Sequence, residues 1–253
     1  MILPVATLAL VTALAQALPA PPPTPPENPF THLLANLGDD ITALPTLQNV
    51  GILATGGLVA LAFKNNNDAR MHTWVLEQTD DSSSASLGNF AGDGITQGGA
   101  AIAVWVAGRV TQNVRLETTG SNLIRAQFLN GLLTQGLKYA VQRDRPDGGA
   151  HSFPSGHTSA TFATAAVIQH DYGFAAALPV YALGGFVGWS RVRSNHHWLS
   201  DVAFGAALGI VSGRAASHSA SGNWAIAPVK TPGGMAIYAV RAWGRGWRQA
   251  RSR

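Results

Sequence analysis

The stretch that decides the fold reads PSGHTSATFATAAVIQH and spans residues 154–170. Proline and glycine at its start mark a turn, and the alanine-rich run that follows predicts a helix over about 157–170, with Ser155 as its N-cap. Backbone amides at the start of a helix bind anions, and Gly156 lets an oxygen approach the main chain closely. His157 would face such an anion from the first helical turn. The same residues also fit a capped helix with an incidental histidine.

Five other apolar stretches are compatible with helices, and no internal repeat is visible. They lie at about 44–63, 95–110, 122–142, 174–190 and 198–213. With the stretch above, they predict an all-α fold, a helical bundle of about six core helices.

The segments between and after these stretches carry different patterns. The polar segment 64–94 is expected to be a loop with a short helix around His72–Gln78. After residue 215, alternating apolar positions flank the turn Pro232-Gly233-Gly234. This pattern predicts a short C-terminal β-hairpin.

The amino-terminal region indicates export. Residues 1–17 form an apolar run ending in small residues, which predicts a secretory signal peptide, with an uncleaved anchor helix as the alternative. Residues 18–30 form a proline-rich linker. The remaining chain divides into a helical domain, 31–215, and a hairpin with a basic tail, 216–253. We therefore expect an exported, periplasmic protein.

Composition leaves the relation to the membrane open. Only 12% of the residues are charged and 46% are hydrophobic, and the uncharged runs 44–63 and 172–190 are each long enough to cross a bilayer. Six spans after an exported amino terminus would, however, place the end of the third helix in the cytoplasm, together with Lys138 and Arg145. A soluble bundle is therefore favoured over an integral membrane enzyme. The arginine-rich tail could touch an anionic membrane surface, but a frayed, solvated terminus is the better interpretation.

The charged and reactive residues narrow the chemistry. The chain has no cysteine, which excludes disulfides, thiolate zinc sites and a thiol nucleophile. Its net charge is +4, from 17 basic residues that are mostly arginine. Because the planar guanidinium suits phosphate, this balance favours an anionic ligand, although a solvated basic surface gives the same composition.

Two further segments carry reactive groups. Lys138 and Arg145 flank the end of the third apolar stretch, where basic side chains also simply favour the negative end of a helix dipole. His197 and Asp201 lie four residues apart, and so are neighbours on one helical face. A carboxylate that accepts one imidazole N–H fixes the tautomer and leaves the other nitrogen free to attack. A lone His–Asp pair of this kind is more often structural.

Together the three segments resemble a known family. Lys138-x6-Arg145-Pro146, Pro154-Ser155-Gly156-His157 and Ser190-Arg191-x5-His197-x3-Asp201 match, in order and spacing, the tripartite signature of type 2 phosphatidic acid phosphatases and the related vanadium haloperoxidases. The resemblance covers about residues 122–213.

The resemblance implies a role for each matching residue. His197 would be the nucleophile, Asp201 would orient it, and His157 would protonate the leaving oxygen and then activate water. The phosphoryl oxygens would be held by Lys138, Arg145, Ser155, Gly156 and Arg191. The chemistry implied is metal-independent phosphate ester hydrolysis through a phosphohistidine, with no cofactor and no nucleic-acid partner.

Two other functions remain open, a vanadium-dependent haloperoxidase and a non-catalytic anion-binding protein. The substrate is open as well. Soluble phosphomonoesters, phosphatidate-like lipids and polyprenyl diphosphates all fit the same site chemistry.

Overall fold

The computed structural model describes residues 37–64, 66–78, 82–219, 223–231 and 234–242. The predicted signal peptide, the proline-rich linker and the basic tail from residue 243 lie outside these ranges. The domain boundaries drawn from the sequence therefore remain predictions.

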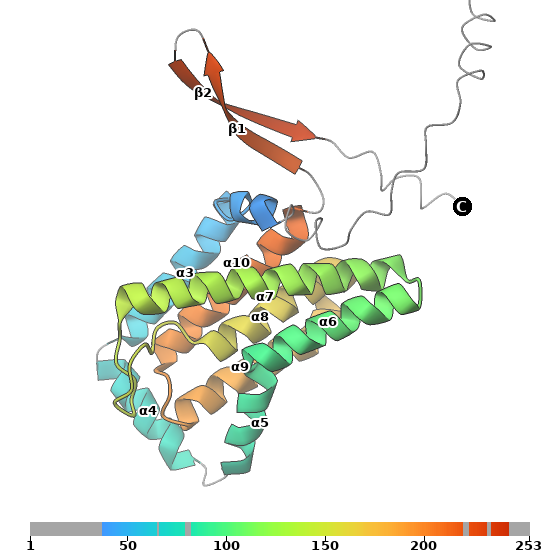
Figure 1. Cartoon of the computed structure of the whole chain (residues 1–253). Helices are drawn as coiled ribbons and strands as arrows, with labels where there is room; N and C mark the ends of the chain where they lie inside the picture. Colours follow the sequence, from blue (N-terminus) through green and yellow to red (C-terminus); the bar gives the residue numbers. More distant parts are fainter. Residues whose placement is uncertain (1–36, 65, 79–81, 220–222, 232–233, 243–253) are drawn as a thin grey trace, which may run out of the picture. The chain divides into compact units, whose positions relative to one another are not determined.

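The described residues between 37 and 219 form a helical bundle, which confirms the all-α prediction for the core (Figure 1). A helical stretch over 37–42 comes first. It is followed by α3 (Leu47–Phe63), α4 (Asn66–Gln78), α5 (Ser82–Gly92), α6 (Gly94–Val110), α7 (Val114–Val141), α8 (Gly156–Tyr172), α9 (Phe174–Arg193) and α10 (Leu199–Ser219).

The six predicted helices are all present, and two of them are clearly longer than expected, α7 at its start and α10 at its end. Helix α7 begins at Val114, eight residues before the predicted start, and the side chain of Asn113 caps it by accepting a hydrogen bond from the Leu116 amide at 3.1 Å. The polar start of α7 lacks an apolar stripe, so hydrophobic patterning alone does not reveal it.

The prediction for the polar segment 64–94 is wrong, because the segment forms two helices, α4 and α5, instead of a loop with one short helix. Neither helix needs a broad apolar face. Helix α4 turns the buried Asp68 inward, and α5 approaches its neighbours through glycines. A Cβ at Gly88 would collide with Ser190 of α9, and one at Gly92 would lie 2.9 Å from the Cβ of His157. In α5, small residues thus stand where an apolar stripe would otherwise contact the neighbouring helices.

Close packing between α8 and α10 sets the geometry of the site. Helix α8 packs against α7, α9 and α10, while α6 lies along α7 and α3 along α10 (Figure 1). Gly205 and Gly209 of α10 lie directly against the backbone of α8, where a Cβ at Gly205 would come within 2.7 Å of the Ser155 carbonyl oxygen. This contact fixes the start of α10 beside the start of α8.

The bundle exposes many large apolar side chains. Leu47 on α3, Ile95 on α6 and Val110 at the end of α6 are 90%, 86% and 77% exposed. Within the described ranges no single helix has both the length and the apolar character of a membrane span, whereas the bent pair Leu47–Phe63 and Asn67–Glu77 meets that test by length and composition alone.

The chain continues into two strands, β1 (Asn223–Thr231) and β2 (Gly234–Ala242). They pair antiparallel, with Ile226 opposite Ala239. Only the backbone of this segment is described, so the hairpin as a packed part of the fold stays a prediction.

Candidate active site

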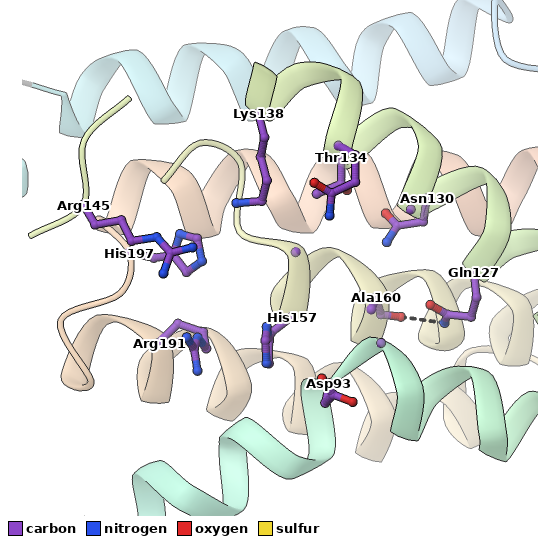
Figure 2. A pocket seen from close by; sticks show the side chains of 14 residues that line it. Asp93, Gln127, Asn130, Thr134, Lys138, Arg145, His157, Ala160, Arg191 and His197 are labelled. Atoms are coloured by element: carbon purple, nitrogen blue, oxygen red, sulfur yellow. Dashed lines mark hydrogen bonds between the residues drawn. The ribbon is translucent and has the colours of Figure 1, made fainter. Parts of the chain in front are cut away.

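The three sequence motifs meet at a pocket of about 400 Å³ (Figure 2). It is bounded by the ends of α7 and α9, the starts of α6 and α8, and the loops before α8 and α10. The lining residues are Asp93, Gly94, Gln127, Asn130, Gly131, Thr134, Gln135, Lys138, Arg145, Gly156, His157, Ala160, Arg191 and His197. A volume of this size suits a small molecule or a lipid headgroup.

Three cationic side chains converge on one end of the pocket: Lys138 from α7, Arg145 from the following loop and Arg191 from α9. In the described part of the chain none of them forms a salt bridge. The Nε atoms of Arg145 and Arg191 are buried without a hydrogen-bond partner there. Lys138 Nζ donates only to the His151 carbonyl oxygen, at 2.6 Å. Three uncompensated cations in one pocket favour a multiply charged anion.

The electrostatics agree with this geometry. Burial and the neighbouring Arg145 lower the pKa of Lys138 to about 8, and the same two causes lower the pKa of Arg191 to about 10. The charge of Arg145 thus makes both Lys138 and Arg191 harder to protonate. A bound phosphate would reverse this repulsion.

His197 lies in the loop that leads into α10 and is 3% exposed. Its Nδ1 is 3.6 Å from Asp201 Oδ2, which is within ion-pair reach and just beyond a hydrogen bond. Burial lowers the pKa of His197 to about 4, although the Asp201 carboxylate opposes that shift. The imidazole is therefore neutral at pH 7, and with its proton on Nδ1, facing the carboxylate, it keeps a lone pair on Nε2.

Asp201 is held by more than the histidine. Arg143 Nη1 donates to Oδ1 at 2.6 Å, while the Ser152 hydroxyl and the Trp198 amide donate to Oδ2. Burial raises the pKa of Asp201, but the contacts with His197, Ser152 and Arg143 outweigh it, so the pKa lies below its usual value. The carboxylate is therefore ionised and fixed in orientation.

His157 occupies the first turn of α8, as the sequence predicts. In Figure 2 its ring and that of His197 lie on opposite sides of the space between Lys138 and Arg191. Burial, and then the charge of Arg191, lower the pKa of His157 to about 4. His157 is thus neutral in the empty pocket.

Of the two residues expected to complete the phosphate cradle, only Gly156 lines the pocket. Ser155 does occupy the N-cap position of α8, but its side chain makes no capping hydrogen bond. Its hydroxyl is fully buried and shares a hydrogen bond of 2.9 Å with the Thr158 hydroxyl. The structure therefore turns this hydroxyl away from the pocket.

The sequence did not reveal the residues that support Asp201 and the loop before His197 from outside the pocket. Arg143, inside the variable part of the first motif, bridges Asp201 and the buried Asp68 of α4, the latter at 2.8 Å. His72 of α4 shares a hydrogen bond of 2.7 Å with Asn195, two residues before His197. The polarity of segment 64–94 was the only available signal, and it predicted a loop.

His151, in the loop before the second motif, is held against the end of α7. Its Nδ1 lies 3.1 Å from the Lys138 carbonyl oxygen, and its own carbonyl oxygen accepts a hydrogen bond from the Lys138 ammonium.

Within the described ranges no group of three or more His, Asp or Glu side chains is arranged to hold a metal ion. Metal independence remains a prediction.

The fold and the site together have a counterpart among known families. Residues 120–225 match the PAP2 superfamily, which confirms the resemblance carried by the three motifs. Over 97 residues the chain is 40% identical to the lipid A 1-phosphatase of Porphyromonas gingivalis. That alignment covers 37% of this chain and 22% of the relative, so the chain matches about a fifth of that protein's length.

Two solved structures are similar as well. The transmembrane PAP2 type phosphatidylglycerolphosphate phosphatase from Bacillus subtilis matches with a TM-score of 0.53 and 18% identity, over 66% of this chain and 92% of that one. Aquifex aeolicus LpxE matches with a TM-score of 0.49 and 18% identity, over 59% of this chain and 94% of that one. The Bacillus subtilis match supports the fold.

Proposed function

We propose that this protein is a metal-independent phosphatase that hydrolyses phosphate esters through a phosphohistidine on His197. One observation carries the proposal: a neutral, buried histidine backed by an ionised carboxylate lies beside three cations that have no ion-pair partner among the described residues, with a second histidine across the pocket. The match to the PAP2 superfamily supports it.

The first chemical step would form an N–P bond. The lone pair on His197 Nε2 attacks phosphorus while the bond to the ester oxygen breaks, and Lys138, Arg145 and Arg191 stabilise the charge on the phosphoryl oxygens. The departing oxygen needs a proton. Because His157 is neutral in the empty pocket, that proton arrives with a monoanionic ester or is taken up by His157 when the anion enters.

The second step would break the N–P bond. Neutral His157 accepts a proton from water as the water oxygen attacks phosphorus, and the electron pair of the N–P bond returns to His197. Phosphate then leaves. Asp201 serves both steps by holding the Nδ1–H tautomer of His197.

We further propose a phosphorylated lipid as the substrate, met at a membrane surface by an exported protein. Exposed apolar side chains directly follow lining residues of α6 and α7 in the sequence: Ile95 is 86% exposed, Phe128 58% and Leu132 56%. Apolar surface beside a phosphate pocket suits the chains of a lipid whose headgroup enters it. The names of the relatives, a lipid A 1-phosphatase and a phosphatidylglycerolphosphate phosphatase, support this class.

The proposed nucleophile is tested by His197→Ala, assayed with p-nitrophenyl phosphate in EDTA. Turnover should fall by several orders of magnitude, and the wild type should form an acid-labile phosphoenzyme that the variant lacks. His196→Ala is the matched control, because His196 is adjacent but does not line the pocket. Its activity should stay within a few-fold of the wild type.

Three results would contradict the proposal: activity of His197→Ala, a requirement for divalent metal, or vanadate-dependent halide oxidation in place of ester hydrolysis. The last would favour the haloperoxidase. Cell fractionation, with sequencing of the mature amino terminus, tests export and signal cleavage.

A further inference from the structure

The pocket extends well past the phosphoryl cradle. Gln127, Asn130, Thr134 and Lys138 follow one another at spacings of three and four residues, and all of them line it from one face of α7. Asn130 precedes Lys138 by eight residues, or roughly 12 Å along the helix axis. The motifs account for the cationic end and assign nothing to the far end.

Asn130 presents an unused acceptor at that end. The side chain is 3% exposed, and its Nδ2 donates to Ser159 Oγ at 3.1 Å. Ser159 has a single hydroxyl proton, which goes to the Gly156 carbonyl oxygen at 3.0 Å, so Ser159 Oγ must accept from Asn130 and from Thr134. This fixes the orientation of the Asn130 amide. Its Oδ1 is buried without a partner among the described residues, and the side chain lines the pocket (Figure 2).

Gln127 is oriented by the same kind of argument. Its Nε2 donates to the Ala160 carbonyl oxygen at 3.0 Å and to Thr164 Oγ1 at 2.9 Å. The Thr164 proton goes to Gln97 Oε1 at 2.6 Å, so Thr164 accepts from Gln127. Both N–H groups of the Gln127 amide are therefore used. Its Oε1 is left as a second acceptor at the pocket.

Asp93 adds a negative charge at this end. One carboxylate oxygen, Oδ2, caps α6 through the amides of Ile95 and Thr96, at 2.9 and 3.2 Å, and the residue lines the pocket. The pocket therefore has two unlike ends, one of cationic donors and one of acceptors. A phosphate is attracted by the first and repelled by the second, so an ester enters in one orientation.

We propose that Asn130 and Gln127, beside Asp93, form a subsite for the leaving group, selecting phosphate esters whose leaving group carries hydroxyl or amide N–H donors. The inference rests on the proposed function, because in-line attack by His197 expels the leaving group on the opposite side, past His157. Figure 2 places Asp93, Asn130 and Gln127 on that side. A buried acceptor without a partner disfavours an aliphatic leaving group, because the acceptor then stays unpaired.

Matched substrate pairs test this subsite in the full-length protein. Myo-inositol 1-phosphate and cyclohexyl phosphate share a six-membered ring and differ in hydroxyl groups. Phosphatidylglycerol phosphate and phosphatidate in detergent micelles form the equivalent lipid pair, which distinguishes a lipid headgroup from a soluble ester. We expect the hydroxylated member of at least one pair to have the higher kcat/KM, by on the order of tenfold.

Variants assign the preference to the subsite. Asn130→Leu should lower kcat/KM for the hydroxylated ester by on the order of tenfold and leave cyclohexyl phosphate within about twofold. Gln127→Leu should also lower kcat/KM for the hydroxylated ester, and it replaces Asn130→Leu as the test if that variant does not fold. Asn122→Leu is the control, because Asn122 is a buried asparagine of α7, 2% exposed, that does not line the pocket. Asn122→Leu should change the melting temperature without changing the ratio of kcat/KM between the hydroxylated ester and cyclohexyl phosphate.

The inference is overturned if the wild type shows no preference within either pair, or if Asn130→Leu slows both members equally, because Asn130 would then only support Ser159. Binding of the soluble pair to the His197→Ala protein, measured by calorimetry, gives the same comparison without turnover. If the wild type hydrolyses no phosphate ester, the proposed function fails. The binding preference still decides whether the acceptor end selects hydroxylated phosphates.

Discussion

Replacing Lys138 by arginine should change how anion binding depends on pH. In the empty pocket, burial and Arg145 lower the pKa of Lys138 from 10.5 to about 8. The shift corresponds to at most about 3.5 kcal/mol, the free energy by which the pocket disfavours the charged lysine until an anion arrives. The anion therefore binds the protonated lysine, and affinity should be lost as the pH rises through 8.

The magnitude follows from the titration. If the bound anion restores the ordinary pKa of Lys138, the inhibition constant is flat below pH 8 and rises about tenfold per pH unit above it, reaching roughly 100-fold at pH 10. The ordinary pKa of arginine, 12.5, lies two units above the 10.5 of lysine, so Lys138→Arg should give a weaker profile that stays nearly flat through pH 8 and 9.

Tungstate is the suitable probe, because it remains a tetrahedral dianion between pH 7 and 10 and its own ionisation adds no slope. Competitive inhibition of p-nitrophenyl phosphate hydrolysis gives the inhibition constant at each pH. An inhibition constant of the wild type that does not change with pH, or that changes with the same slope in Lys138→Arg, would refute this argument. Either result would mean that anion binding does not depend on protonation of Lys138.

Three further predictions follow from the site and from the packing behind it. NMR titration should show the His197 imidazole of the ligand-free protein neutral down to about pH 4, because burial lowers its pKa, and a midpoint near the ordinary 6.5 would contradict this. Arg143→Lys should lower kcat by on the order of tenfold with KM nearly unchanged, because a lysine cannot bridge both buried carboxylates; loss of thermal stability alone would mean a purely structural role. Gly209→Ala should cost about 1–3 kcal/mol of folding stability, since its Cβ would collide with the Ser159 carbonyl oxygen, whereas Gly136→Ala has open space and should be neutral or stabilising. Equal melting temperatures for these two glycine variants would argue against the close packing of α8 and α10.

The sequence predicts the reactive end of the pocket better than its surroundings. Each of the three motifs is short and lies at the end of a helix, where local spacing already determines which side chains are neighbours. His197 and Asp201 do come together, with Nδ1 and Oδ2 3.6 Å apart, although His197 lies in the loop before α10 and not on its helical face as the spacing predicts. Ser155 is the exception. Its position at the helix start was predictable, but the direction of its hydroxyl depends on Thr158 and on the backbone of α10.

The remaining site depends on tertiary contacts that no local pattern encodes. Asp68 precedes Arg143 by 75 residues, and only the packed fold brings these side chains together. Hydrophobic patterning also missed α5, because glycines at 88 and 92 replace an apolar stripe where the helix packs closely. Asn130 is the most hidden case, since its free oxygen is recognised only after the single proton of Ser159 has been assigned.

The cationic end and the acceptor end of the pocket have different roles in the proposed reaction. Burial keeps both histidines neutral, helped by the charge of Arg191 at both and of Lys138 at His197, and this suits His197 as a nucleophile and His157 as the base that activates water. The same neutrality leaves His157 without the proton that the leaving oxygen requires. An entering anion offsets the cations, and Asp93, whose charge already raises the pKa of His157, acts from the leaving-group side. Protonation of His157 is thereby coupled to substrate binding, on the side where the ester bond breaks.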